Sequence, residues 1–236
     1  MRSSSSARTI IKDFRRSHVG KCQPRRVAIS SLYALRRQWL SITTSSSRRG
    51  RLTQMAHASI GAVLGPGDFA VDATAGKGYD TVFLANQVGF TGQVLALDVQ
   101  LGALEATRER LRAFDCETQV RLIHGCHSLL HDYLPTNVPL QAAMFNLGFL
   151  PGSNKEVVTR PQTTIAALAT CLESLRISES TGGMVSVMAY RGHPGGQDEA
   201  DSIADFLGGL LPHRYKVQQH EAPGSGPHLW LVQRIR

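Results

Sequence analysis

Polar side chains flank a glycine loop in the segment "VDATAGKGYDTVFLA", residues 71–85, which reads as a strand followed by a helix. Gly76 and Gly78 leave the loop backbone open to a ligand, because neither residue has a Cβ atom. Asp72 and Asp80 place one carboxylate on each side of the loop. A turn of this kind often holds a nucleotide-like ligand at the carboxyl end of a strand, so the neighbouring residues must decide which ligand fits.

The loop departs from both common phosphate-binding patterns. A dinucleotide fingerprint needs a third glycine where this chain has Thr81, and no Gly-Lys-Ser/Thr sequence follows at the phosphate-loop spacing. Two carboxylates would also repel a phosphate. A sulfonium beside an ammonium suits the loop better, since Asp72 or Asp80 can accept a charge-assisted hydrogen bond. S-adenosylmethionine carries both cations and no phosphate; the alternative is a tight turn without a ligand.

Three further strand ends carry polar residues. Asp98 closes "VLALD" 20 residues after Gly78, the spacing at which a carboxylate meets ribose hydroxyls, although a helix N-cap is the alternative. In "HGCHS", residues 124–128, His127 or Ser128 could border an adenine pocket. Asn146 ends the fourth strand, where its amide oxygen could orient an attacking nitrogen; the alternative is a turn residue that bonds to local backbone.

The elements that position these residues alternate along the chain. We expect helices at 52–64, 79–88, 101–114, 162–176 and 197–211, and strands at 69–73, 93–99, 119–125, 141–147, 183–190, 215–222 and 228–235. Alternation predicts an α/β fold with a mostly parallel sheet, and the turn "PGSGP" predicts a closing hairpin with one antiparallel strand. Seven strands in this layout are typical of the Rossmann-like class I methyltransferases.

Composition excludes several classes of protein. The 236 residues are 42% hydrophobic, enough for one domain with an extension, and no apolar run reaches the roughly 18 residues that span a bilayer. We therefore expect no membrane partner. Four cysteines lie far apart without a CxxC pair, a spacing that favours neither a disulfide framework nor a metal site.

The basic charge is concentrated in residues 1–50. This segment carries 12 Lys and Arg and one acid, whereas the remaining residues carry 14 basic and 17 acidic side chains. Its Ser/Arg-rich composition is typical of organelle transit peptides, and a basic tail that binds RNA is the alternative. We expect residues 1–50 to be a targeting or disordered arm and residues 51–236 to be the catalytic domain.

Five segments in order resemble one known family, labelled "putative rRNA methylase": "DATAGKGYDTVFLA", "LDVQ", "CHS", "FNLGFLPGSNK" and "YRGHPGG". The resemblance covers nearly all of residues 52–236. It implies S-adenosylmethionine as cofactor and, as in bacterial members, methylation of the 5-aminomethyl group of wobble 2-thiouridine in the anticodon stem-loop of tRNA. Plant members carry organelle targeting arms, which implies a chloroplast or mitochondrial location; without such targeting the location would be cytoplasmic. The resemblance leaves open whether the protein forms a homodimer.

The resemblance also assigns roles to particular positions. The methionine end of the cofactor would lie against Asp72, Gly76, Gly78, Asp80 and Thr81. The ribose and adenine would be held by Asp98 and Gln100, with His127 and Ser128 nearby. The target amine would face Asn146, joined by Tyr190 and His193, and His193 is the candidate proton acceptor.

The chain departs from the family pattern at Lys77, Phe149 and Asn154, where an Asn, a Tyr and an Asp are usual. Rival functions are a methyltransferase for another amine in rRNA, protein or a small molecule, and a non-catalytic protein that binds cofactor or RNA. An NAD-dependent oxidoreductase is disfavoured by the missing third glycine. If the domain binds tRNA, a local basic patch is needed, and we expect it from Lys155, Arg160, Arg191, Arg214 and Lys216.

Overall fold

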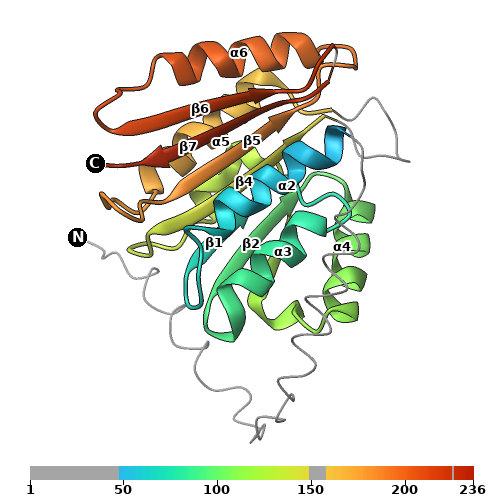
Figure 1. Cartoon of the computed structure of the whole chain (residues 1–236). Coiled ribbons are helices and arrows are strands. Elements are labelled where there is room, and N and C mark those ends of the chain that lie inside the picture. Colours follow the sequence, from blue (N-terminus) through green and yellow to red (C-terminus); the bar gives the residue numbers. More distant parts are fainter. Residues whose placement is uncertain (1–47, 149–157, 225) are drawn as a thin grey trace, which may run out of the picture. The chain divides into compact units, whose positions relative to one another are not determined.

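One seven-stranded sheet runs through the part of the chain that the computed structural model describes, residues 48–148, 158–224 and 226–236 (Figure 1). The strand order is β3-β2-β1-β4-β5-β7-β6. The strands are β1 (Phe69–Asp72), β2 (Gln93–Asp98), β3 (Val120–His124), β4 (Leu140–Leu147), β5 (Met184–Ala189), β6 (Tyr215–Glu221) and β7 (His228–Arg234).

Strand direction confirms the expected class. β1 pairs in parallel with β2 and β4, and the pairs β2–β3 and β4–β5 are also parallel. β7 runs antiparallel to both β5 and β6, so it is inserted between them. Its apolar run is buried over nearly its whole length, whereas most side chains of the edge strand β6 are exposed. The arrangement is that of a Rossmann-like class I methyltransferase.

Helices cover both faces of the sheet (Figure 1). One face carries α2 (Arg48–Gly61), α3 (Tyr79–Val88) and α4 (Leu101–Ala113), and the other carries α5 (Pro161–Ser174), α6 (Gly196–Gly208) and the 3-10 helix η4 (His127–Asp132). Two more 3-10 turns, η2 (Gly89–Thr91) and η3 (Glu117–Gln119), follow α3 and α4. None of these described helices has the length and apolar content to cross a membrane.

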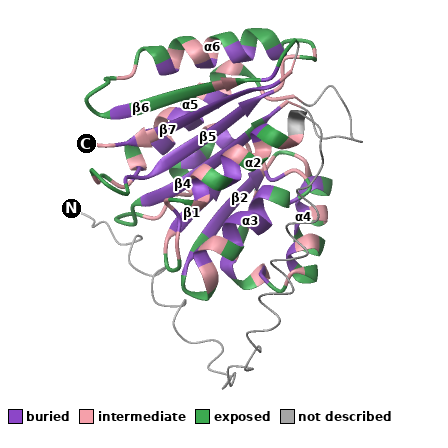
Figure 2. Ribbon diagram, viewed as in Figure 1, coloured by how far each residue is buried: buried purple, intermediate pink, exposed green. Residues whose placement is uncertain are grey.

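The main core lies between the sheet and the layer of η4, α5 and α6. Fully buried members are Leu130, Phe145, Leu168, Ile203 and Trp230. The central strands β1, β4 and β5 are buried almost throughout (Figure 2), which is expected of parallel strands covered on both faces. This packing makes the sheet a rigid support, so residues at its carboxyl edge keep fixed relative positions.

The structure differs from the sequence expectations in detail. The helices and strands agree to within a few residues, and α2 already begins at Arg48, inside the segment assigned to the arm. The 3-10 turns were not expected. The predicted basic patch is wrong in part, because Arg214 and Lys216 lie where β6 begins, at the sheet edge opposite the carboxyl ends of β1 and β4. Lys155, Phe149 and Asn154 lie outside the described residues.

Gly78 is constrained by both its backbone and its surroundings. It has φ +77°, and a Cβ there would lie 2.9 Å from Thr107 Cα, a backbone atom of α4 that cannot move aside cheaply. We expect Gly78→Ala to lower the free energy of unfolding by more than about 1 kcal/mol in denaturant titrations. Gly102→Ala is the matched control, because a Cβ at Gly102 meets nothing within 4 Å, and it should be neutral or slightly stabilising.

Candidate active site

Three polar residues meet at the carboxyl edge of the central strands. Asp72 ends β1 and pairs in register with Ala96 of β2 and Met144 of β4. Asp98 and Asn146 therefore lie two residues further along, on either side of β1. The sheet thus places a carboxylate on one flank of the glycine loop and a carboxamide on the other.

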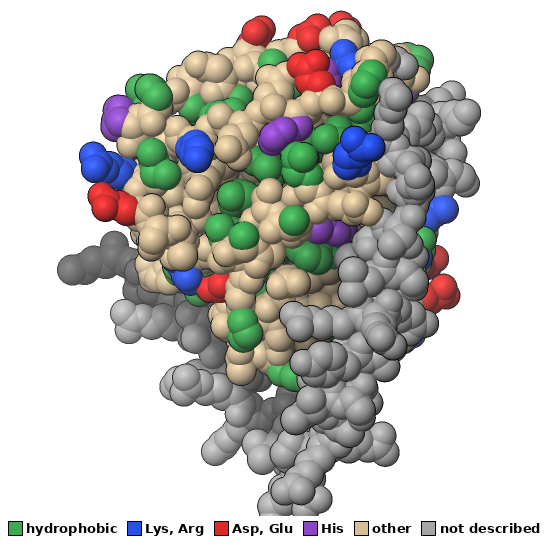
Figure 3. Space-filling model, in the orientation of Figure 1, with side chains coloured by type: hydrophobic (Ala, Val, Ile, Leu, Met, Phe, Trp, Pro, Cys, Tyr) green, Lys and Arg blue, Asp and Glu red, His purple; other side chains and the backbone are tan. Residues whose placement is uncertain are grey.

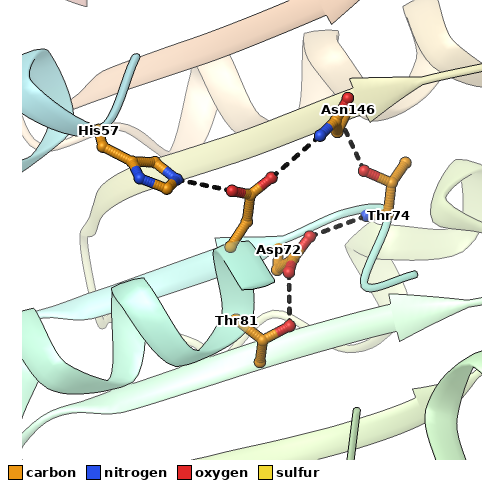
Figure 4. Close-up of polar contacts among 6 residues, drawn as sticks. His57, Asp72, Thr74, Thr81 and Asn146 are labelled. Atoms are coloured by element: carbon orange, nitrogen blue, oxygen red, sulfur yellow. Dashed lines mark hydrogen bonds and ion pairs between the residues drawn. The ribbon is translucent and has the colours of Figure 1, made fainter. Parts of the chain in front are cut away.

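Asp72 organises the start of the glycine loop. Its side chain is fully buried, where Oδ2 accepts a hydrogen bond from the Thr81 hydroxyl at 2.6 Å and Oδ1 accepts one from the Thr74 N–H at 3.1 Å (Figure 4). Burial raises the pKa of Asp72 to about 7, the nearby charges of Asp80 and Asp98 add to this, and the two hydrogen bonds oppose it. Its expected contact with a cofactor ammonium stays a prediction.

This raised pKa predicts how stability depends on pH. The folded state holds the Asp72 proton more tightly than the unfolded state, so the stabilisation is complete below pH about 4 and is lost as pH rises toward 7. Asp72→Asn can keep both hydrogen bonds, because the Thr81 hydroxyl can accept as well as donate. We expect this variant to lose less stability than the parent between pH 5 and pH 8. Equal slopes in urea titrations would contradict the prediction.

Asp98 joins the glycine loop to the start of α4. Its Oδ2 accepts the Gly76 N–H at 2.9 Å and its Oδ1 accepts the Gln100 N–H at 2.8 Å. Gln100 itself is the N-cap position of α4, so Asp98 is not the cap that the alternative interpretation proposed. The carboxylate is partly exposed and each oxygen has a lone pair left. Thr107 supports the loop from behind by donating to the Gly76 carbonyl at 3.1 Å.

His127 and Ser128 begin η4, directly after β3. The His127 ring is buried edge-on to Phe145, with ring centroids 6.2 Å apart, and burial lowers its pKa. Among the described residues, none bonds to its Nε2 atom, which is itself buried. The Ser128 hydroxyl donates to Cys126 Sγ at 3.1 Å.

Asn146 is exposed, yet its side chain is oriented. The amide Nδ2 donates to Asp80 Oδ2 at 3.3 Å, and Asp80 Oδ1 accepts a hydrogen bond from His57 Nε2 at 2.7 Å (Figure 4). The backbone N–H of Asn146 donates to the Thr74 hydroxyl at 2.7 Å. The side chain therefore contacts a distant carboxylate, in contrast to the turn-residue alternative, in which it bonds to local backbone.

Tyr190 and His193 lie against the end of β4. A Cβ on Gly148 would be 3.4 Å from His193 Nε2 and 3.7 Å from Tyr190 Cβ, so both residues adjoin the chain two positions after Asn146. Arg191 donates to the carbonyl groups of Gly224 and Gly226, which ties the β6–β7 turn to the same region. The structure thus brings the substrate-side residues of the sequence prediction together.

Sequence reasoning missed several residues of this edge. His57 lies on α2, 23 residues from the carboxylate that it contacts, and a histidine on an amphipathic helix gave no signal of a site. Buried Glu199 on α6 accepts hydrogen bonds from Thr159 and Thr164, and Thr159 in turn accepts the Gly148 N–H. Only the fold brings His57 to Asp80, and Glu199 by way of Thr159 to the end of β4.

The site favours a cation and disfavours a phosphate. Asp72, Asp80 and Asp98 are close enough that both of the others raise the Asp72 pKa. Ionised carboxylates around a glycine loop attract positive charge and repel negative charge, and the raised pKa of Asp72 reduces its share of this charge at neutral pH. Within the described ranges no group of His, Cys, Asp and Glu has the arrangement of a metal site. These carboxylates, which accept hydrogen bonds, therefore fit a cationic ligand with hydroxyl groups.

Several known proteins are similar to this chain in sequence or in structure. Residues 94–228 match the family described as "Putative rRNA methylase". A protein of Arabidopsis thaliana, "tRNA (mnm(5)s(2)U34)-methyltransferase, chloroplastic", is 35% identical over 173 residues, which is 69% of this chain and 61% of that protein. The chain thus spans less than two thirds of that relative's length.

Two solved structures are also similar. A "putative rRNA-methylase" from Clostridium thermocellum shares 33% identity with a TM-score of 0.73, covering 78% of this chain and 97% of that chain. A "putative methyltransferase" from Streptococcus mutans, solved in complex with S-adenosylhomocysteine, shares 32% identity with a TM-score of 0.69, covering 80% and 99%. From the sequence motifs, the strand order and these matches, the chain belongs to the rRNA methylase family.

Proposed function

We propose that this protein transfers the methyl group of S-adenosylmethionine to the exocyclic amine of 5-aminomethyl-2-thiouridine at the wobble position of tRNA. The observation that carries the proposal is the orientation of Asn146 beside the glycine loop. Asp80 engages its amide nitrogen, so the amide oxygen remains as an exposed acceptor. The name of the Arabidopsis thaliana relative supports the nucleotide, and the Streptococcus mutans complex supports the cofactor.

The residues of the carboxyl edge fit S-adenosylmethionine. The carboxylate of Asp98 has lone pairs for the ribose hydroxyls, and Gln100 follows it at the start of α4. His127 and Ser128 would border the adenine. The loop residues Asp72, Gly76, Gly78, Asp80 and Thr81 would hold the cationic methionine end in their negative potential. When bound, the sulfonium supplies an activated methyl group.

The protein contributes to catalysis mainly by orienting the attacking amine. The attacking amine must be neutral, and one of its N–H groups can donate to Asn146 Oδ1, which directs the nitrogen lone pair toward the cofactor side. After transfer the amine carries an extra proton. His193, which lies against Gly148 beside Tyr190, is the residue that we assign to accept it. The His193 Nδ1 atom is 3.0 Å from the Pro194 carbonyl oxygen, to which it can donate a hydrogen bond.

Residues 51–236 carry 14 basic and 17 acidic side chains, so this part of the chain is slightly acidic. Binding of a polyanion such as tRNA therefore requires a local concentration of positive charge. Arg160 at the start of α5 and Arg191 after β5 lie at the carboxyl edge. On the face shown in Figure 3, the Lys and Arg side chains of the described residues are scattered rather than gathered. We assign recognition of tRNA to a few contacts beside the site, among them Arg160 and Arg191.

We also propose that residues 1–50 direct the protein to a chloroplast or mitochondrion, as their composition and the chloroplastic relative suggest. Fusing these residues to a fluorescent protein tests this. Organelle fluorescence is the expected result, and a diffuse cytoplasmic signal would contradict it.

Methyl transfer by the purified protein tests the activity itself. The substrates are S-adenosylmethionine with tRNA carrying 5-aminomethyl-2-thiouridine, the same tRNA without the aminomethyl group, and rRNA. We expect the methylaminomethyl nucleoside from the first RNA only. Methylation of the unmodified tRNA or of rRNA would instead identify another amine as the target. Calorimetry should also show binding of S-adenosylmethionine but not of NAD.

A further inference from the structure

His57 lies outside every motif that defines the carboxyl edge, yet it is part of the hydrogen-bond chain there. It sits on α2, and its ring stacks on Phe83 with centroids 4.1 Å apart and an interplanar angle of 8°. Its Nε2 atom is 2.7 Å from Asp80 Oδ1, and both side chains are only 10% exposed. A buried histidine held by stacking on one face and by a carboxylate at its edge has a fixed position.

The Asp80 carboxylate links His57 to Asn146, because it accepts a hydrogen bond from each of them (Figure 4). The second oxygen of the Asp80 carboxylate accepts the Asn146 Nδ2–H group at 3.3 Å. An ionised carboxylate accepts hydrogen bonds and cannot donate them, so only the amide nitrogen can face it. The Asn146 oxygen must then point away from Asp80. The contact therefore decides which end of the amide is offered to a substrate.

The two hydrogen bonds of Asp80 are unequal. The bond from His57 is short, whereas the bond from Asn146 is beyond the usual 2.7–3.2 Å range and is weak alone. The terminal torsion of an aspartate is broad, so one weak donor would not fix the plane of its carboxylate. His57 supplies the stronger restraint, and the plane of Asp80 follows from it.

We propose that His57 is a positioning residue for methyl transfer: by fixing the carboxylate of Asp80, it holds the Asn146 amide with its oxygen toward the attacking amine. The kinetic consequence rests on the proposed function, while the orientation of the amide does not. His57 itself touches neither the cofactor nor the amine in this account.

Two substitutions separate the hydrogen bond from the packing. His57→Phe keeps an aromatic ring to stack on Phe83 but removes the donor to Asp80. His57→Gln restores a donor without the ring. His131→Phe is the matched control, because it breaks another His–Asp pair, at 3.0 Å, whose side chains are 62% and 57% exposed.

The kinetic test is a double-mutant cycle for methyl transfer to the tRNA substrate. We expect His57→Phe to lower kcat by roughly tenfold, within the range for residues of one hydrogen-bond network, and to leave the KM for tRNA and the Kd for S-adenosylmethionine within about twofold. His57→Gln should recover part of kcat, and His131→Phe should match the parent. In an Asn146→Ala background, His57→Phe should cause no further loss. An equal loss in both backgrounds, or a loss confined to cofactor Kd, would overturn the proposal.

Nuclear magnetic resonance gives a readout that needs no substrate. The side-chain amide signals of Asn146 can be identified because they vanish in Asn146→Ala. We expect them to move in His57→Phe and to return toward their parental position in His57→Gln. Unchanged signals in His57→Phe would refute the positioning role. If the parent protein methylates no RNA, the proposed function fails while this measurement still decides whether His57 orients Asn146.

Discussion

Replacing Asn146 with alanine is expected to lower kcat for methyl transfer by about 10²-fold or more while the affinity for S-adenosylmethionine changes little. A displacement of a nucleophile by about an ångström has an effect of this size. The structure supports separate effects on kcat and on cofactor affinity. Asn146 lies on β4, on one side of β1, whereas Asp98 lies on β2, on the other side. The measurement is the single-turnover rate on tRNA that bears 5-aminomethyl-2-thiouridine.

Asn146→Asp provides the companion variant. It keeps an acceptor oxygen but sets a second carboxylate against Asp80, whose oxygen is 3.3 Å from the present Nδ2 atom. Two carboxylates that share a site repel, so one must bind a proton or turn away. We expect activity between those of the parent and the alanine variant. Parental rates for Asn146→Ala would reduce Asn146 to a turn residue and shift the mechanism to Tyr190 and His193.

Replacing Asp98 with alanine should produce the converse result, a large loss of cofactor affinity. The variant lacks the acceptor for the ribose hydroxyls, a cost of about 1–3 kcal/mol or roughly 5- to 150-fold in Kd. Part of this loss comes from the protein itself, since the Gly76 and Gln100 N–H groups lose their acceptor. Calorimetry with S-adenosylmethionine measures the affinity.

Two controls make the Asp98 result specific. Asp132→Ala removes an exposed acid whose ion pair, within the described part of the chain, is with exposed His131, and the variant should bind cofactor like the parent. Asp98→Asn keeps one acceptor oxygen, so its affinity should lie between those of the parent and Asp98→Ala. If Asp98→Ala binds S-adenosylmethionine as tightly as the parent, the assignment of the ribose to Asp98 is wrong.

Much of the fold could be predicted from local sequence patterns. Short apolar runs ended by polar residues, as at Asp72 and Asp98, gave the strands, and periodic segments such as residues 101–114 gave the helices. The sequence predicted that one strand of the closing hairpin is antiparallel, but not which one, because a hairpin can join a sheet in more than one way. Arg214 and Lys216 were misplaced for that reason.

Site residues at strand ends could be predicted from the sequence. Residues that reach the site only through contacts with distant partners could not. Strand ends of a parallel sheet meet at one edge, so Asp98 and Asn146 could be placed together from sequence. His57, Thr107 and Glu199 could not, since their partners are 23 to 40 residues away and no local pattern records the pairing. The orientation of the Asn146 amide depends on one such contact.

The most direct test of the central claim is nucleoside mass spectrometry of organellar tRNA from cells that lack this protein. The account predicts that 5-methylaminomethyl-2-thiouridine disappears and that its precursor, 5-aminomethyl-2-thiouridine, accumulates. Re-expression of the parent should restore the methylated nucleoside, and re-expression of Asn146→Ala should not. Unchanged levels of both nucleosides in the deficient cells would contradict the account.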